Sequence, residues 1–296
     1  METLVTRTLH RCLLTCAVLG IASAPVWAQA PPSPPGEAAA APSPAAAQDA
    51  DDPDLDINVA QPDFMLATLP TTLRVPRHRM AFALTHRFGR PLAAGSFGSL
   101  VGDLFGLDSG AVVGLNLRYG LARGLQVDFN RTSSRTITFS TQYEIKNQKS
   151  FPVGIAAVAS VDGTNNFRDS YSPGIQAVIS REVGDRAAIY VEPAWINNTN
   201  AQPKAIVDHN DTVLVGLGAR VRVGKTTYLM LEASPRVSGY APGVTHASFG
   251  IEKRAGGHLF QLNFSDGFGT TLAQVARGGT SHRDWYIGFN LSRKFY

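Results

Sequence analysis

The chain has 296 residues, of which 44% are hydrophobic, and a formal net charge of +4. No run approaches the ~20 consecutive apolar residues of a membrane-spanning helix, so the sequence excludes a helical membrane protein. It does not exclude a membrane β-barrel, because each barrel strand is apolar on only one face and its average hydropathy stays near zero.

The first 28 residues have the features of a secretory signal. A basic start is followed by an apolar run over residues 12–24 and by small residues around Ala28, where we predict cleavage. The chain's two cysteines, Cys12 and Cys16, both lie in this segment. The mature protein would therefore have no disulfide, no thiolate nucleophile and no cysteine-bound metal.

Residues 29–63 are predicted to be a disordered periplasmic arm. They are rich in Pro and Ala, end in an acidic run, and have too little apolar surface to offset the entropy of ordering. Their seven acids and no base leave residues 64–296 with a net charge of +10. A basic domain suits nucleic acid, but an exported chain rarely meets it, so we expect phosphorylated lipid head groups or small anionic solutes as partners.

From residue 77 onward the chain shows repeated two-residue alternation between apolar and polar side chains, separated by turn residues. The predicted strands cover residues 77–88, 111–119, 124–131, 135–145, 151–161, 174–181, 187–196, 211–223, 226–234, 247–254, 257–265 and 284–296. The fold class is therefore all-β, a single antiparallel transmembrane β-barrel of about twelve strands within residues 64–296. Residues 64–76 stay unassigned.

The polar faces of these strands favour a barrel over a soluble sandwich. They carry Gly, Ser, Thr, Asn and Gln with isolated charges, which suits a crowded lumen better than a solvent-exposed face. The residues predicted to line the lumen are Arg118, Glu192, Arg220, Arg222, Glu232, Glu252 and Asn290. Their charges have two open roles, an internal salt-bridge network that closes a small barrel or a selectivity filter.

The last segment, residues 284–296, has the pattern of a closing strand. We expect it to pair with the strand at residues 77–88 and to be the part that the barrel-assembly machinery recognises. Aromatic side chains concentrate at the interfaces between lipid and water in such barrels. The predicted interface aromatics are Tyr119, Trp195, Trp285, Phe295 and Tyr296.

The connections alternate between short and long. If the short ones face the periplasm, both termini do too, and the long ones are external loops, as in outer-membrane barrels. The glycine-rich loop 95–110 lacks the Gly-Lys-Ser/Thr of a phosphate loop but has apolar residues spaced for a short helix. We expect it to fold over the barrel mouth, with a gating role as the alternative.

Three motifs add a resemblance. They are His86-Arg87-Phe88-Gly89 followed by Leu104-Phe105-Gly106-Leu107-Asp108-Ser109-Gly110, then Gly256-Gly257-His258-Leu259-Phe260-Gln261-Leu262, and finally Gly288-Phe289-Asn290-Leu291-Ser292-Arg293-Lys294-Phe295. Together they resemble a bacterial family of outer-membrane β-barrel proteins known only as a domain of unknown function. The resemblance implies a porin-like barrel of a Gram-negative outer membrane, and it brings no activity and no catalytic residues.

The sequence does not predict an enzyme, a metal site or a cofactor. His86, His258 and Ser265 invite comparison with barrel phospholipases, which makes lipid hydrolysis the least favoured hypothesis. The leading hypothesis is a narrow pore for small anionic solutes, because excess Arg and Lys raise the local anion concentration. The alternative is a plugged structural or partner-binding barrel, and a sealed lumen would decide against the pore.

Overall fold

The computed structural model describes residues 58–200 and 211–296. Its strands are β1 (Met80–Phe88), β2 (Ala111–Ala122), β3 (Leu125–Thr132), β4 (Ile137–Lys146), β5 (Gly154–Gly163), β6 (Tyr171–Val183), β7 (Ala187–Ile196), β8 (Thr212–Arg222), β9 (Thr227–Ser234), β10 (Arg236–Ser238), β11 (His246–Ala255), β12 (His258–Ser265) and β13 (Tyr286–Lys294). The helical segments are α2 (Phe97–Gly102), η1 (Leu104–Gly106) and α3 (Leu272–Ala276). The predicted strands are confirmed, and the short β10 was not predicted.

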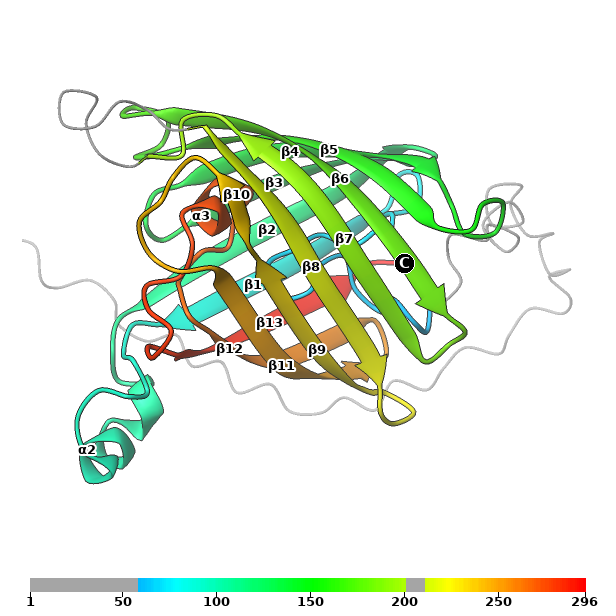
Figure 1. The fold of residues 1–296 in the computed structure, drawn as a ribbon. Coiled ribbons are helices and arrows are strands. Elements are labelled where there is room, and N and C mark those ends of the chain that lie inside the picture. Colours follow the sequence, from blue (N-terminus) through cyan, green and yellow to red (C-terminus); the bar gives the residue numbers. More distant parts are fainter. Residues whose placement is uncertain (1–57, 201–210) are drawn as a thin grey trace, which may run out of the picture. The chain divides into compact units, whose positions relative to one another are not determined.

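The strands form a closed antiparallel barrel (Figure 1). β13 closes the ring against β1, with Leu84 opposite Leu291, as the terminal strand predicts. β8 pairs with both β7 and β9, and β10 continues beyond β9 to add a short pairing to β8. Twelve strands complete the ring, so its backbone N–H and C=O groups have partners on both sides and no sheet edge is left open.

The two faces of each strand differ as the alternation predicts. In β7, Ile189, Val191 and Trp195 are exposed on the outer surface, whereas Tyr190 and Glu192 are buried inside. The same pattern repeats around the barrel and gives an outer belt of large exposed apolar side chains. Within the described ranges, no helix has the length and apolar character to cross a membrane.

The two ends of the barrel differ in their connections. The short turns after β2, β4, β6, β8 and β11, together with residues 77–79 and the C-terminus, lie at one end, called here the turn end (Figure 1). The longer connections, including 89–110 and 266–285, lie at the other end, called here the loop end. The link from β3 to β4 is the short exception at the loop end.

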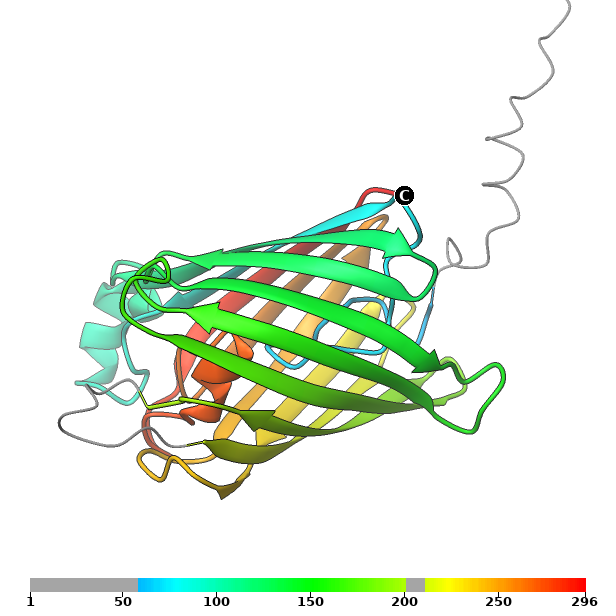
Figure 2. The same cartoon turned by 90° about the horizontal axis from the view of Figure 1, so that it is seen from above.

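Residues 58–76 fill the interior of the barrel (Figure 2). They enter from the turn end, reverse at residues 66–69 and return to β1 as a hairpin, in which Leu66 N–H donates to Leu69 O at 2.8 Å and Thr71 N–H donates to Phe64 O at 2.8 Å. We call this segment the inner hairpin. It includes residues 58–63, which the sequence assigned to the arm, whereas the predicted signal and the rest of the arm lie outside the described residues.

The loop that enters the barrel mouth is not the expected one. The connection 266–285 carries α3 into the loop end, where Ala273 and Ala276 pack against Ile196 and Leu214. The glycine-rich loop 95–110 instead stands beside the barrel, with α2 projecting outward (Figure 1). Just before this loop, Leu92 N–H donates to Trp285 O at 2.8 Å and attaches the chain to the segment before β13. The prediction that the glycine-rich loop covers the mouth was therefore wrong.

Candidate functional site

The tip of the inner hairpin is bound by the carboxylate of Glu232 on β9. One oxygen, Oε2, accepts hydrogen bonds from the backbone N–H groups of Ala67, Thr68 and Leu69 at 3.1, 3.0 and 3.1 Å. The other oxygen accepts the Thr68 hydroxyl. Glu232 is buried, so this turn supplies the donors that a desolvated carboxylate needs.

The carbonyl groups of the same turn face cationic and amide donors. Ala67 O accepts Arg87 Nη2 at 3.1 Å and Asn290 Nδ2 at 3.0 Å. Leu66 O accepts Gln261 Nε2 at 3.2 Å. β1, β12 and β13 thus bind the side of the turn opposite to the one that Glu232 holds.

Arg220 on β8 joins the hairpin to a buried ion pair. Its Nη2 donates to Met65 O at 2.8 Å, while its Nε and Nη2 donate to the two carboxylate oxygens of Glu252 at 2.7 and 2.9 Å. Both side chains of the pair are fully buried. A two-point Arg–carboxylate bond of this kind is strong and geometrically specific, so it fixes the guanidinium toward Met65.

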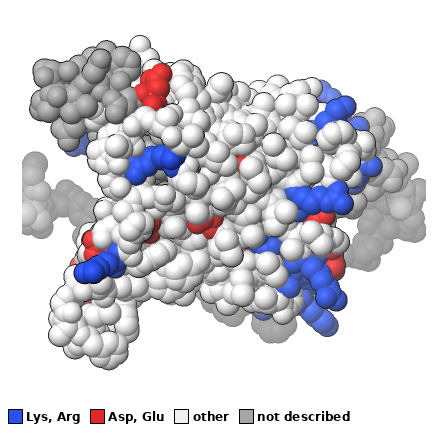
Figure 3. Space-filling model, in the orientation of Figure 1, with Lys and Arg blue, Asp and Glu red and all other residues white. Residues whose placement is uncertain are grey.

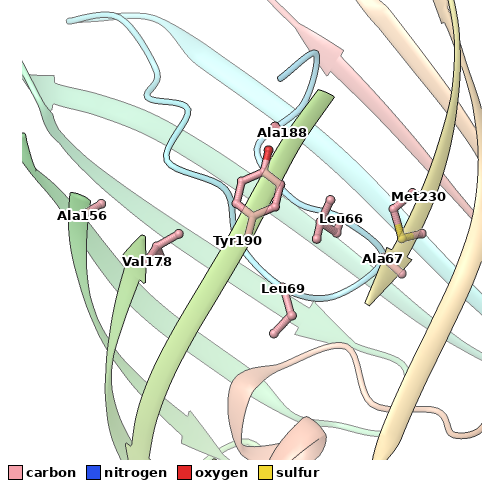
Figure 4. Packing of buried hydrophobic residues seen from close by; sticks show 8 residues of the cluster. All are labelled: Leu66, Ala67, Leu69, Ala156, Val178, Ala188, Tyr190 and Met230. Carbon is pink, nitrogen blue, oxygen red and sulfur yellow. The ribbon is translucent and has the colours of Figure 1, made fainter. Parts of the chain in front are cut away.

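Apolar contacts complete the packing around the tip (Figure 4). Leu66, Ala67 and Leu69 meet side chains from β5, β6, β7 and β9. Those partners are Ala156, Val178, Ala188, Tyr190 and Met230. Tyr190 also donates its hydroxyl to Gln61 Oε1 at 3.1 Å, so its polar end is satisfied within the hairpin.

Two glycines of β8 make room for this packing. A side chain at Gly218 would overlap Leu66, and the first carbon of one at Gly216 would lie 3.1 Å from Leu69 Cδ1. The lumen wall of β8 is therefore shaped to accept the hairpin.

The base of the hairpin is held at the turn end. Asn58 Nδ2 donates to Glu182 at 2.9 Å, and Gln61 donates to the same carboxylate oxygen. On the return arm, Val75 N–H donates to Gln126 Oε1 at 2.7 Å. Both arms of the hairpin are thus attached to the wall, on β6 and β3.

Asp63 is the one acid of the hairpin among the described residues, and its side chain is buried. It accepts Phe64 N–H and the Ser292 hydroxyl, both at 2.9 Å. Burial raises the pKa of Asp63 above its ordinary value, and the charges of Arg220 and Lys294 counter part of that rise. The carboxylate therefore costs more to ionise here than in water.

A cavity of ≈ 80 Å³ remains between the hairpin and the α3 loop. Its wall is polar on the β2–β4 side, where Arg118 and Asp128 form an ion pair with 3.1 Å between Nε and Oδ2. Leu69, Thr271 and Leu272 close it from the two inserted segments. This space is large enough for a few water molecules, and Asn116 in its wall has a buried oxygen atom without a partner among the described residues.

The structure brings most of the residues predicted to line the lumen into one connected site. Glu232, Asn290, Arg220 and Glu252 all act on the hairpin, directly or through one partner, and Glu192 accepts Gln176 Nε2 at 2.6 Å nearby. Arg118 is buried beside the cavity. Arg222 differs, because it lies at the rim of the turn end, partly exposed, where Nη1 donates to Asp185 at 2.6 Å.

The aromatic residues predicted at the membrane interfaces mostly face outward. Trp195 and Phe295 are exposed, and the Trp285 ring lies 5.2 Å from that of Phe249. Tyr119 is at the turn end, with its hydroxyl 3.2 Å from His78 Nδ1. Tyr296 is the exception, because it turns inward against the cluster that contains Phe64 and Val75.

The residues considered for lipid hydrolysis do not form a catalytic group. Ser265 faces the lumen at the loop end of β12, where its hydroxyl lies 3.1 Å from that of Ser248. His258 is at the opposite end of the same strand, with its ring 6.1 Å from Phe260. His86 stacks on Phe289 on the outer surface. Over the described residues, no group of three or more His, Cys, Asp or Glu side chains is arranged to hold a metal ion.

Sequence reasoning missed the hairpin and several of the wall side chains that hold it. Arg87 and Gln261 lie on the polar faces of their strands, but neither was selected, and Asp63 was placed in the arm. Gly216 and Gly218, two residues apart on one lumen face, were a usable signal, since they indicate that something bulky approaches that wall.

A closed barrel with an apolar outer belt and a polar, occupied interior defines a membrane-bound β-barrel protein. The chain belongs to the family described as a membrane bound beta barrel domain (DUF5777), whose model matches residues 63–295. This match confirms the resemblance carried by the three sequence motifs. The description of the family names a membrane-bound barrel and no activity.

The chain has low similarity to several solved structures. The NanC porin is 9% identical, with a TM-score of 0.48, over 73% of this chain and 99% of that chain. An active-site mutant of outer membrane phospholipase A from Escherichia coli is 12% identical, with a TM-score of 0.42, over 80% and 95%. A triple mutant of the Rhodopseudomonas blastica porin is 12% identical, with a TM-score of 0.34, over 62% and 55%. No curated protein matches the chain.

Proposed function

We propose that this protein is an outer-membrane barrel whose lumen is closed by its own inner hairpin. Residues 1–28 would act as a cleaved export signal, and the turn end would face the periplasm, where short turns and both termini are expected. Lipid would surround the apolar belt, and the barrel-assembly machinery would recognise β13. No enzymatic activity is part of the proposal.

The observation that carries this proposal is the attachment of the hairpin tip to the wall. The N–H groups of residues 67–69 share one carboxylate, and the carbonyls of residues 65–67 accept four side-chain donors. A hydrogen bond to a charged group contributes about 1.5–3 kcal/mol, so several together oppose spontaneous exit of the hairpin. This geometry favours the plugged alternative over a permanently open pore.

The same contacts bear on the anion-pore hypothesis. Arg220 and Arg87 are the lumen cations that would attract anions, yet in this structure both donate to hairpin carbonyls. An anion pathway along these residues would require the hairpin to move. We therefore expect anion-selective conductance only when the hairpin has left the lumen.

Planar-bilayer recording of three chains tests the proposal. The mature chain is expected to give no steady conductance, and a variant that lacks residues 58–76 is expected to conduct. A variant that lacks residues 29–48 but keeps residues 49–76 is the matched control and should stay closed. Steady conductance of the unmodified chain would overturn the proposal, as would a silent hairpin deletion that is correctly folded.

If the hairpin deletion conducts, its ion selectivity tests the second part of the argument. Arg87→Gln and Arg220→Gln in that background should lower the preference for anions, because they remove two lumen cations whose N–H groups the hairpin carbonyls had occupied. Arg222→Gln is a control at the rim, where the side chain is already paired with Asp185.

A further inference from the structure

Charge is distributed unevenly between the two ends of the barrel. In Figure 3 the Lys and Arg side chains gather at the right-hand end, which is the turn end, while a broad band of the visible surface between the ends carries few charges. The basic residues of the turn end are Arg74, Arg77, Arg79, Arg123, Lys146, Lys149, Arg181, Arg186, Arg222, Lys225, Lys253, Arg254, Arg293 and Lys294. The acids of this end in the described chain are Glu144, Glu182 and Asp185. Most of the positive charge of the folded part is therefore concentrated here.

A cleft of ≈ 530 Å³ opens at this end beside the base of the inner hairpin. Its wall includes hairpin residues 58–61 and 72–74 and the turn that follows β4, with Lys146 and Lys149. Both lysines are exposed, and neither forms an ion pair with a described residue. The wall also contains Arg74 and three acids, of which Glu144 pairs with Arg74, Asp185 pairs with Arg222, and Glu182 accepts Asn58 and Gln61. Lys146 and Lys149 are therefore the two cations of the wall that are available to a negatively charged ligand.

The sequence places such a ligand next to the cleft. Asp49, Asp51, Asp52, Asp54 and Asp56 immediately precede the hairpin. Asn58, which lines the cleft and donates to Glu182, fixes the chain two residues after the end of that run. Since an extended chain covers at most ~3.5 Å per residue, Asp56 lies within about 7 Å of Asn58 and Asp49 within about 32 Å.

We propose that the periplasmic cleft binds the acidic run 49–56 of the same chain, and that this docking holds the base of the inner hairpin in place. The proposal rests on the hairpin being the resident plug. Lys146 and Lys149 are the residues that would bind the aspartates. The short tether keeps the run at a local concentration in the millimolar range, so even weak ion pairs suffice for occupancy.

The docking should be sensitive to salt and to the charge of the run. Exposed ion pairs are screened over about 10 Å at 0.1 M salt and about 3 Å at 1 M. A tether without attraction would keep the run near the cleft at every salt concentration, but the distance between the run and the cleft would vary widely. The quantity to measure is therefore the width of the distance distribution, and not the mean distance alone.

Spin-label distance measurements provide that readout, because the mature chain would contain no cysteine. Labels at Ala50→Cys and Ser150→Cys report on the acidic run and on the turn beside Lys149. A single narrow distance distribution is expected at low salt, with clear broadening at 1 M salt. A distribution that is already broad at low salt in the full chain would overturn the proposal.

Charge variants separate attraction from tethering. Changing the five aspartates of the run to Asn keeps the tether and should broaden the distribution, and so should Lys146→Gln combined with Lys149→Gln. Arg135→Gln combined with Arg168→Gln, two cations of the loop end, is the matched control and should leave the distribution narrow. A narrow distribution in the five-Asn variant would overturn the proposal.

Two further measurements distinguish failure of the docking proposal from failure of the proposal that the hairpin closes the barrel. If the distribution narrows only in vesicles that contain anionic phospholipid, the rim cations bind lipid head groups and the docking proposal fails. Bilayer conductance of the same chains tests the plug independently. A broad distribution in a chain that does not conduct overturns docking alone, whereas a conducting unmodified chain overturns both.

Discussion

Glu232 holds Thr68 through both of its carboxylate oxygens. Oε2 accepts the Thr68 N–H at 3.0 Å, and Oε1 accepts the Thr68 hydroxyl. The two residues are 164 positions apart in the sequence, so this contact joins the start of the folded chain to β9 across the lumen. A buried acid on a barrel wall thereby acts as a binding site for the protein's own backbone.

The first prediction concerns this contact. Glu232→Gln removes the charge but keeps the size of the side chain, so the three N–H groups of residues 67–69 lose a charged acceptor. A loss of about 2 kcal/mol is expected from the strength of charge-assisted hydrogen bonds. Amide hydrogen exchange at residues 67–69 should then be roughly 30-fold faster, provided that it occurs through local opening of the hairpin.

Asp128→Asn is the control for that experiment. Asp128 also faces the lumen and is ion-paired, but its partner is Arg118, and neither residue bonds to the hairpin tip. Exchange at residues 67–69 should therefore be nearly unchanged in this variant. Equal acceleration in both variants would mean that the hairpin responds to general loosening of the barrel and not to Glu232.

The second prediction uses the glycines of β8. Gly218→Ala should destabilise the protein by about 1–3 kcal/mol, because the new Cβ overlaps the side chain of Leu66. Leu66→Ala in the same chain removes the overlap, so the double variant should be more stable than the sum of the two single changes allows. Unfolding in urea, followed for all four chains, gives the coupling. Strict additivity would show that Leu66 does not occupy this position.

The third prediction addresses Arg220 and Glu252. Replacing one member of a fully buried ion pair leaves the other charge without compensation, which typically costs 3–5 kcal/mol. Arg220→Met alone should therefore destabilise more than Arg220→Met combined with Glu252→Met. The midpoint of thermal unfolding in detergent checks the order. If the double variant is the less stable one, the pair contributes more attraction than its burial costs.

The barrel itself followed from the sequence because strand periodicity is a local property. Residues such as Ile189 and Tyr190 alternate in polarity, and that alternation sets the face of each side chain without knowledge of distant partners. Even the pairing of β1 with β13 could be predicted. In a closed barrel the first and last strands each have one free edge, and these two edges pair with each other.

The hairpin could not be predicted in the same way. Its residues have no strand or helix period, and its contacts are among the most distant in the chain, with Ala67 and Asn290 223 positions apart. Glu232 and Arg220 were selected as lumen residues, but a list of charges does not show whether they pair with one another, with solutes or with backbone. The assignment of residues 58–63 to the disordered arm was based on composition and was wrong. These residues continue the polar arm in sequence, yet Glu182 and Ser292 hold them in the lumen.

The fourth prediction follows from the raised pKa of Asp63. An acid whose pKa is higher in the folded state binds protons more tightly there, so its contribution to stability is fully present below the ordinary value of 3.8 and is lost as the pH rises through the raised value. Asp63→Asn has no carboxyl group to ionise, so the variant does not lose this stability as the pH rises. The free energy of unfolding of the variant, relative to that of the unmodified chain, should therefore increase between pH 4 and pH 7. Parallel pH profiles for the two chains would contradict the assignment.

The fifth prediction separates the two segments that occupy the lumen. The α3 loop closes the loop end through apolar packing on Ile196 and Leu214 and through the Thr271 hydroxyl, which donates to Asp162. It does not replace the hairpin contacts deeper in the barrel, which all come from residues 58–76. Replacing residues 267–283 by a short turn should therefore leave the barrel closed to ions. The same replacement in the hairpin deletion should raise conductance above that of the hairpin deletion alone, because a second obstruction is removed in series. Single-channel amplitudes of the three variants check this order, and steady conductance from loss of the α3 loop alone would assign the main seal to that loop instead of the hairpin.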